Sequence, residues 1–206
     1  MRELMAALAV AAVCVGATRP VSVLAQGSPV QTVKGGILDE AKLFTAKLPA
    51  TKVVVMRLFS ATDADLTQGD KKDDTKKMQP IAPGLLADEF VAKIKTMGVF
   101  TGAAVLTGDV TPPDAIVVEG RFREMDPGSR AKRYFVGYGA GKSGVMVEGT
   151  VKAFDGTVLA TFQQRRVGVM GVAGGDSMEK MKGDTKAIGE DIAKFLTAWA
   201  TGKKLK

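Results

Sequence analysis

The sequence predicts an α+β domain, with a mixed, mainly antiparallel sheet of about four strands and two amphipathic helices packed on one face. Three observations carry this prediction. One segment is a nearly continuous apolar run of strand length, several segments alternate between apolar and polar residues, and two longer segments repeat apolar residues at helical spacing. Stacking both helices on one side of the sheet would bury all of these apolar stripes.

The first predicted strand is KVVVMRLFS, residues 52–60. Its apolar residues follow one another almost without interruption, which is typical of a strand covered on both faces. Residues 26–50, before it, show only a weak pattern and predict an irregular lead-in, with one short helix as the alternative. Residues 61–83, after it, hold nine charged residues between Asp63 and Lys77 and two prolines, so they predict a long, mobile, charged loop.

The two predicted helices come before and after the alternating strands. The first is GLLADEFVAKIKTM, residues 84–97, which ends at Gly98. Its apolar face consists of Leu86, Phe90, Ile94 and Met97. The last helix runs to about Ala200. It begins near Asp176 if the segment continues through Gly183, and near Asp184 if Gly183 interrupts it.

Three alternating segments predict strands with one buried and one exposed face. Residues 115–123 place Ile116, Val118, Gly120 and Phe122 on one face and Glu119, Arg121 and Arg123 on the other. Residues 145–153 and 158–162 alternate in the same way, and Asp155-Gly156 between them predicts a long antiparallel hairpin. We expect residues 51–200 to form one domain, followed by a basic tail at 201–206.

Residues 1–25 have the pattern of a secretory signal peptide: a basic start, an apolar run too short to span a bilayer, and small residues before a cleavage site after Ala25. We therefore expect an exported protein, periplasmic or associated with the outer envelope. An uncleaved membrane anchor is the alternative interpretation, because Glu3 and Arg19 depart from the pattern of a cleaved signal peptide. Cys14 follows Val13, where lipid-attachment sites favour a small residue, so the sequence argues against a lipoprotein.

The composition excludes several classes of enzyme. The chain has no histidine, and its one cysteine lies in the predicted leader, so it cannot build a Ser-His-Asp triad, a thiol nucleophile or a zinc site with His or Cys ligands. We expect a protein with no catalytic residues, no cofactor and no metal. Asp70, Asp73 and Asp74 lie among four lysines, which favours a solvated loop over a cation site.

Two carboxylates on the predicted strands need a separate interpretation. Glu119 and Glu148 lie on neighbouring strands, where an acid pair of a hydrolase could form. We expect them instead to form surface salt bridges with Arg121 or Lys152.

The formal net charge of +7 favours an anionic partner. Outside the cytoplasm such a partner is an acidic envelope protein or an anionic membrane or glycan surface, and not nucleic acid. The alternative is a surface charge that serves only solubility. The predicted partner surface consists of the strand residues Arg121, Arg123, Arg165 and Arg166. We therefore expect a non-enzymatic binding or accessory protein.

The stretch GYGAGKSG, residues 137–144, resembles a phosphate-binding loop but does not fit one. Gly141, Lys142 and Ser143 match its end, while Val136 stands where the first glycine is required. The residues after Ser143 predict a strand, so no helix N-terminus would face a phosphate. The sequence therefore disfavours nucleotide binding.

The same glycine-rich stretch is the candidate site for a small anionic, glycan or lipid ligand. Basic and aromatic residues alternate around its glycines, as on a stacking platform. The candidate residues are Arg130, Arg133, Tyr134, Tyr138, Lys142 and Ser143. The alternative is structural: three glycines on one face of an extended chain would let another element pack closely.

The order VVEGRF, a basic turn, then GYGAGKSGVMVEGTVKAFDGTVLATF resembles bacterial exported proteins of the domain-of-unknown-function family numbered 4410. The resemblance covers about Val53 to Trp199 and is most specific at residues 137–143. It implies an envelope location, a compact α+β domain and no catalytic residues to carry over.

Overall fold

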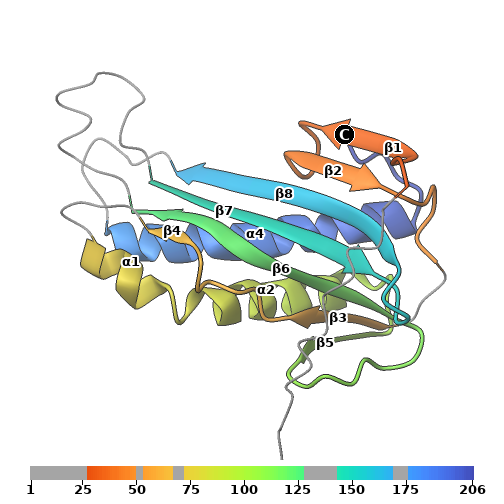
Figure 1. Ribbon diagram of the computed structural model, residues 1–206, viewed down its shortest axis with the longest axis horizontal. Helices are drawn as coiled ribbons and strands as arrows, with labels where there is room; N and C mark the ends of the chain where they lie inside the picture. The colour runs from red at the N-terminus through yellow and green to blue at the C-terminus, as the bar shows by residue number, and fades with distance from the viewer. Residues whose placement is uncertain (1–26, 50–52, 67–71, 128–142, 169–175) are drawn as a thin grey trace, which may run out of the picture.

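The computed structural model describes residues 27–49, 53–66, 72–127, 143–168 and 176–206. These residues form one eight-stranded mixed sheet with three helices on one side of it (Figure 1). The strands are β1 (Gln31–Lys34), β2 (Glu40–Leu43), β3 (Val53–Arg57), β4 (Asp65–Leu66), β5 (Gly102–Leu106), β6 (Ala115–Asp126), β7 (Ser143–Lys152) and β8 (Val158–Gly168). The helices are α1 (Lys72–Met78), α2 (Ala82–Met97) and α4 (Ser177–Ala200).

The strand order is β1-β2-β8-β7-β6-β3-β5, with β4 paired to β6 beyond the end of β3. The pairs β3–β5, β3–β6 and β4–β6 are parallel, and the remaining pairs are antiparallel. Strand β6 therefore joins an antiparallel half of the sheet to a parallel half. Among the described residues, no helix is long and apolar enough to cross a bilayer.

The α+β class is confirmed, but a sheet of about four strands with two helices is wrong. The lead-in at 26–50 contains the hairpin of β1 and β2, and the charged segment at 61–83 contains β4 and α1. The missed strands are at most five residues long, so their alternation is too brief to stand out. Strand β5, GAAVL, also carries small residues of low strand propensity.

Strand β3 confirms the prediction of a strand covered on both faces. Val54 and Met56 belong to the main core beneath the helices, while Val55 packs on the other side with Ala115 and Val117. A strand buried on both faces needs no polar alternation, which explains its continuous apolar run.

Both predicted helices are confirmed. Helix α2 buries Leu86, Phe90 and Ile94, and it ends at Gly98, whose φ of 65° is left-handed. Helix α4 starts after Asp176, whose side chain accepts a hydrogen bond from the Met178 amide. Gly183, which left the start of this helix open in the sequence, lies inside α4 and does not interrupt it.

The indole of Trp199 on α4 is buried, and its Nε1 has no hydrogen-bond partner among the described residues. We expect Trp199→Phe to change the free energy of unfolding by less than about 1 kcal/mol, because removing an unsatisfied donor offsets the lost packing. Urea unfolding followed by far-ultraviolet circular dichroism measures this, since the variant lacks the chain's one tryptophan. A loss of about 3 kcal/mol would contradict the account.

Candidate functional site

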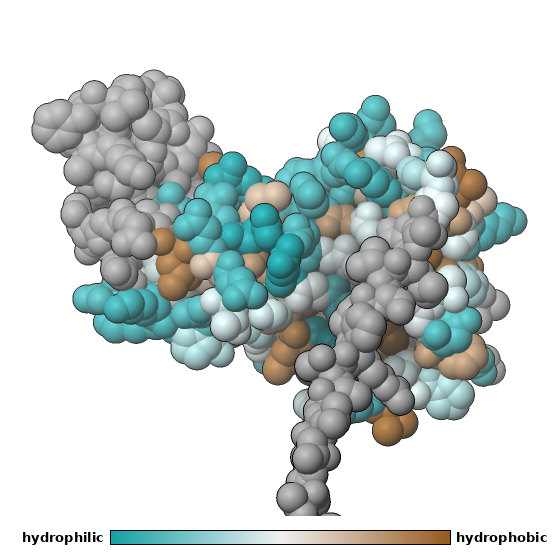
Figure 2. All heavy atoms as spheres, in the orientation of Figure 1, coloured by the Kyte–Doolittle hydropathy of each residue, from teal (hydrophilic) through white to brown (hydrophobic). Residues whose placement is uncertain are grey.

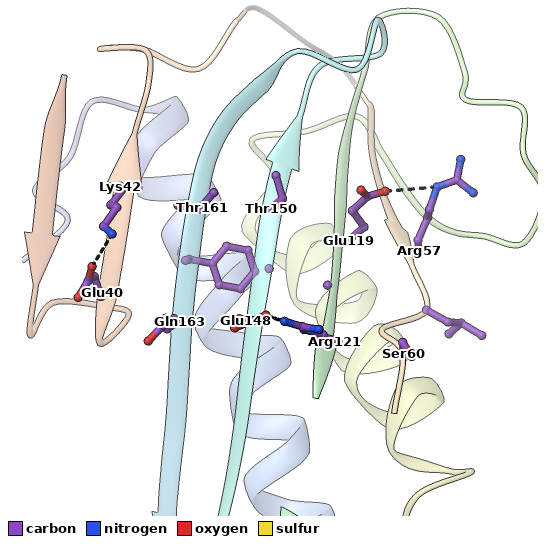
Figure 3. A pocket seen from close by; sticks show the side chains of 14 residues that line it. Glu40, Lys42, Arg57, Ser60, Glu119, Arg121, Glu148, Thr150, Thr161 and Gln163 are labelled. Carbon is purple, nitrogen blue, oxygen red and sulfur yellow. Dashed lines mark hydrogen bonds and ion pairs between the residues drawn. The ribbon is translucent and has the colours of Figure 1, made fainter. Parts of the chain in front are cut away.

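The helices cover one face of the sheet (Figure 1), and the other face is called here the open face. Polar and charged side chains of β2, β6, β7 and β8 lie over its middle. Hydrophilic residues gather over the middle of this face in the space-filling view (Figure 2). The open face is hollowed into a cavity of about 600 Å³. Its lining residues are Glu40, Lys42, Arg57, Leu58, Ser60, Glu119, Gly120, Arg121, Glu148, Gly149, Thr150, Thr161, Phe162 and Gln163 (Figure 3).

The register of four strands arranges these side chains in two rows that cross the sheet (Figure 3). One row is Lys42, Thr161, Thr150 and Glu119, on β2, β8, β7 and β6. The other row is Glu40, Gln163, Glu148 and Arg121, in the same strand order. Residues two apart in a strand lie about 6.6 Å from each other, so the rows form the walls of a trough perpendicular to the strands.

Two glycines form the middle of the trough floor, with aromatic rings beneath them. Gly120 and Gly149 are opposite one another on β6 and β7. On the helix side of the sheet, a Cβ at Gly120 would lie 2.6 Å from Phe59 Cε2, and one at Gly149 would lie 2.4 Å from Phe162 Cζ. The absence of side chains therefore lets both rings pack directly against the backbone under the cavity.

Cations outnumber carboxylates among the ion-paired side chains of the open face. Seven cationic side chains contact four carboxylates, and three of the four carboxylates each contact two cations. The groups are Lys34 and Lys42 with Glu40, Arg57 and Lys152 with Glu119, Arg121 and Arg123 with Glu148, and Arg165 with Glu124. This group of side chains therefore carries a surplus of positive charge.

The predicted salt bridges of the two strand carboxylates are confirmed. Glu119 accepts a hydrogen bond from Lys152 Nζ, and Glu148 Oε1 accepts one from Arg121 Nε at 2.6 Å. Arg57 adds a second contact to Glu119, with Nε 3.6 Å from Oε2. The two carboxylates are thus parts of separate ion-pair groups.

The predicted partner arginines are divided between the two faces. Arg121, Arg123 and Arg165 lie on the open face, whereas Arg166 turns to the helix side and donates from Nε to Asp191 Oδ2 on α4, at 2.8 Å. Adjacent residues of a strand point to opposite faces, so Arg165 and Arg166 cannot share one surface. Arg166 therefore does not share a strand face with the other three arginines, and their role as a partner surface stays a prediction.

Asp184 on α4 lies near Arg166, and burial raises the pKa of its carboxyl, although Lys180 and Arg166 oppose this. A raised pKa of an aspartate contributes stability that is present at low pH and is lost as the pH rises through the folded-state value. We therefore expect Asp184→Asn to raise the free energy of unfolding at pH 7 by no more than about 1 kcal/mol. Denaturant unfolding of the unaltered chain and of Asp184→Asn checks this from about pH 4 to 7, the range in which a carboxyl with a raised pKa titrates. A gain that grows as the pH falls would contradict it.

The candidate ligand residues Arg130, Arg133, Tyr134, Tyr138 and Lys142 lie outside the described residues. Ser143 is the first residue of β7, and its side chain is likewise not described. A small anionic, glycan or lipid ligand at this stretch stays a prediction. The strand that follows Ser143 does confirm that no helix starts there.

Sequence reasoning missed several residues of the cavity. Lys42 and Glu40 lie on a strand too short to be recognised, and Arg57 is a single polar residue within an apolar run, at the end of β3. Thr150 and Thr161 occupy polar positions of the alternating strands, so the alternation could have placed them on the exposed face. These residues line one trough because of the register between the strands, and no local sequence pattern determines that register.

Comparison with known proteins gives several similar solved structures and one family. A PelC dodecamer from Paraburkholderia phytofirmans in space group P6 aligns with a TM-score of 0.43 and 11% identity, covering 74% of this chain and 96% of that chain. A single-substitution variant of that dodecamer, in space group C2, aligns with a TM-score of 0.42 and 13% identity, over 74% and 95%. No curated protein matches the chain. Residues 53–172, more than half of the chain, match the family described as a domain of unknown function, so the chain belongs to the DUF4410 family.

Proposed function

We propose that the chain is a non-enzymatic binding or accessory protein of the cell envelope, and that its open face binds an acidic protein partner. One observation carries the proposal: the helices cover one face of the sheet, while the other exposes seven cations around four carboxylates. A surplus of one sign of charge attracts a partner surface of the opposite sign and speeds its docking.

The chemistry of the cavity supports binding over catalysis. Glu119 and Glu148 are held by cations, and the sequence has no histidine to act as a general base beside them. Thr161 and Thr150 occupy the middle of one row, and Gln163 lies beside Glu148 in the middle of the other. Hydroxyl and amide groups both donate and accept hydrogen bonds. These groups suit recognition of a polar surface. The envelope location rests on the leader pattern of residues 1–25.

A pair of photo-crosslinking variants tests the proposal. A photoreactive residue replaces Gln163 on the open face in one variant and Ala92 on the exposed side of α2 in the other. In intact cells, we expect the variant at position 163 to trap one defined envelope protein with an acidic surface, and the variant at 92 to trap none. Equal trapping from both positions, or contacts between copies of the chain only, would refute the proposal.

A further inference from the structure

A β-bulge on β6 lies beside two exposed arginines, Arg121 and Arg123, at one end of the open face. The pairing with β7 shifts between Phe122 and Glu124, which leaves Arg123 without an opposite residue. Because of this extra residue, Met125 turns into the core and Glu124 stays partly exposed. Arg121, Arg123 and Glu124 therefore all reach the open face within one short stretch of strand.

One carboxylate serves both arginines. Glu148 Oε1 lies 2.6 Å from both Nε and Nη2 of Arg121, whereas Glu148 Oε2 lies 3.5 Å from Nε of Arg123. The two arginine side chains are 46% and 48% exposed. A single carboxylate charge cannot neutralise two guanidinium groups, and each guanidinium has five N–H donors. The pair therefore keeps one positive charge and has donors that face solvent.

A third arginine approaches the same place from β8. Arg165 crosses β7 above Gly144, where a Cβ would lie 3.6 Å from its Nε, and Arg165 Nη2 reaches Glu124 Oε1 at 2.7 Å. The glycine leaves room for the guanidinium to lie over the strand. Three guanidinium groups and two carboxylates thus meet at the bulge, with Asp126 following further along β6.

We propose that Arg121 and Arg123 bind an oxyanion of the phosphate type, with Arg165 as a third cation beside it. The planar guanidinium fork matches the geometry of phosphate oxygens, and two forks suit a group with more than one negative charge. Glu148 holds the Arg121 guanidinium in place before the ligand arrives and competes with the ligand for it. Exposed ion pairs are weak, so a multiply charged oxyanion can displace this carboxylate. The source is a soluble phosphate monoester or a lipid phosphate headgroup.

The proposal goes beyond the proposed function and shares with it only the open face. Titration of the full chain with inorganic phosphate, by calorimetry at low salt, tests the site. We expect Arg123→Gln to weaken the affinity about tenfold, because a charge-assisted contact is lost. We expect Glu148→Gln to strengthen it about threefold or more, because the internal competitor is gone. A gain of affinity cannot come from misfolding, so this variant remains informative if Arg123→Gln is unstable.

Two control variants separate the site from general charge effects. Glu40→Gln changes the net charge as Glu148→Gln does, and Lys42→Gln changes it as Arg123→Gln does, but both lie at the other end of the trough. We expect each control to leave the phosphate affinity within about twofold of the unaltered chain. The site is refuted if the controls move the affinity as much as the bulge variants, or if the unaltered chain binds no phosphate.

A vesicle assay identifies the source of the oxyanion. The unaltered chain and Arg123→Gln are sedimented with vesicles of phosphatidylcholine alone and of phosphatidylcholine with phosphatidic acid. Binding that needs phosphatidic acid and is lost in Arg123→Gln supports a lipid headgroup. Binding of inorganic phosphate without binding to either vesicle supports a soluble phosphate monoester. A partner trapped from position 163 with no phosphate binding would overturn this inference and leave the proposed function standing.

Discussion

Gly189→Ala is expected to lower the free energy of unfolding by about 2 to 3 kcal/mol, despite the better helix propensity of alanine. Gly189 lies where α4 meets α2. A Cβ at this position would lie 2.5 Å from the Leu86 carbonyl oxygen and 3.1 Å from the Phe90 amide nitrogen. Both contacts are to the backbone of α2, so relief requires the whole helix to shift. The packing of the two long helices under the sheet, α2 and α4, therefore depends on this glycine.

Gly183→Ala on the same helix is the matched control. Apart from the adjoining residues and the backbone of α4 itself, no heavy atom of the described residues lies within 4 Å of the position that a Cβ at Gly183 would occupy. We expect this variant to raise the free energy of unfolding by about 1 kcal/mol, the usual gain of alanine over glycine in an exposed helix position. Urea unfolding followed by Trp199 fluorescence measures both variants. Shifts of the same sign and size in both would contradict close helix packing at Gly189.

Asp191→Ala is expected to lower the free energy of unfolding by about 3 kcal/mol. Asp191 is 4% exposed, and its Oδ2 accepts hydrogen bonds from Gln164 Nε2 at 2.7 Å and from Arg166 Nε at 2.8 Å. Gln164 is buried as well, so the substitution leaves its amide without an acceptor inside the protein. The Gln164 side chain also accepts from the Asp39 amide at 2.9 Å, which ties α4 to β8 and to the turn before β2.

Glu190→Ala, at the neighbouring position, is the control for the loss of a carboxylate. Glu190 forms ion pairs with Lys194 on the same helix and with Lys93 on α2, and its side chain is partly exposed. Its hydrogen bond from Lys194 lowers the pKa of its carboxyl. Exposed pairs of this kind contribute little, so we expect a change within about 0.5 kcal/mol. The same unfolding measurement applies, and equal losses in both variants would show that burial of Asp191 does not decide its contribution.

The longest elements could be predicted from the sequence because their patterns repeat several times. The helical period of α2 and α4 and the alternation of β6, β7 and β8 each extend over enough residues to identify element and buried face. Strands β1, β2 and β5 have four or five residues, and their place in the sheet is set by pairing with distant strands. Local composition does not contain that pairing.

The candidate site, too, could be predicted from the sequence only in part. The alternation of β6 placed Arg121 and Arg123 on the exposed face, as the structure has them. Applied to β8, the same alternation separates Arg165 from Arg166, which the prediction of one shared arginine surface overlooked. The trough could not be predicted, because it depends on the register of four strands. The bulge at Arg123 is equally invisible, since one extra residue leaves no local sequence signal.

The central claim is that the open face is covered by a partner in the cell while the helix face stays free. Lysine acylation tests it on the unaltered protein, with labelling compared in intact envelopes and in the purified chain. Lys42 and Lys152 lie on the open face, and Lys95 and Lys186 are exposed on α2 and α4. We predict that labelling of Lys42 and Lys152 falls in the envelope while labelling of Lys95 and Lys186 is unchanged. Equal labelling of the open-face lysines in both states would contradict the claim.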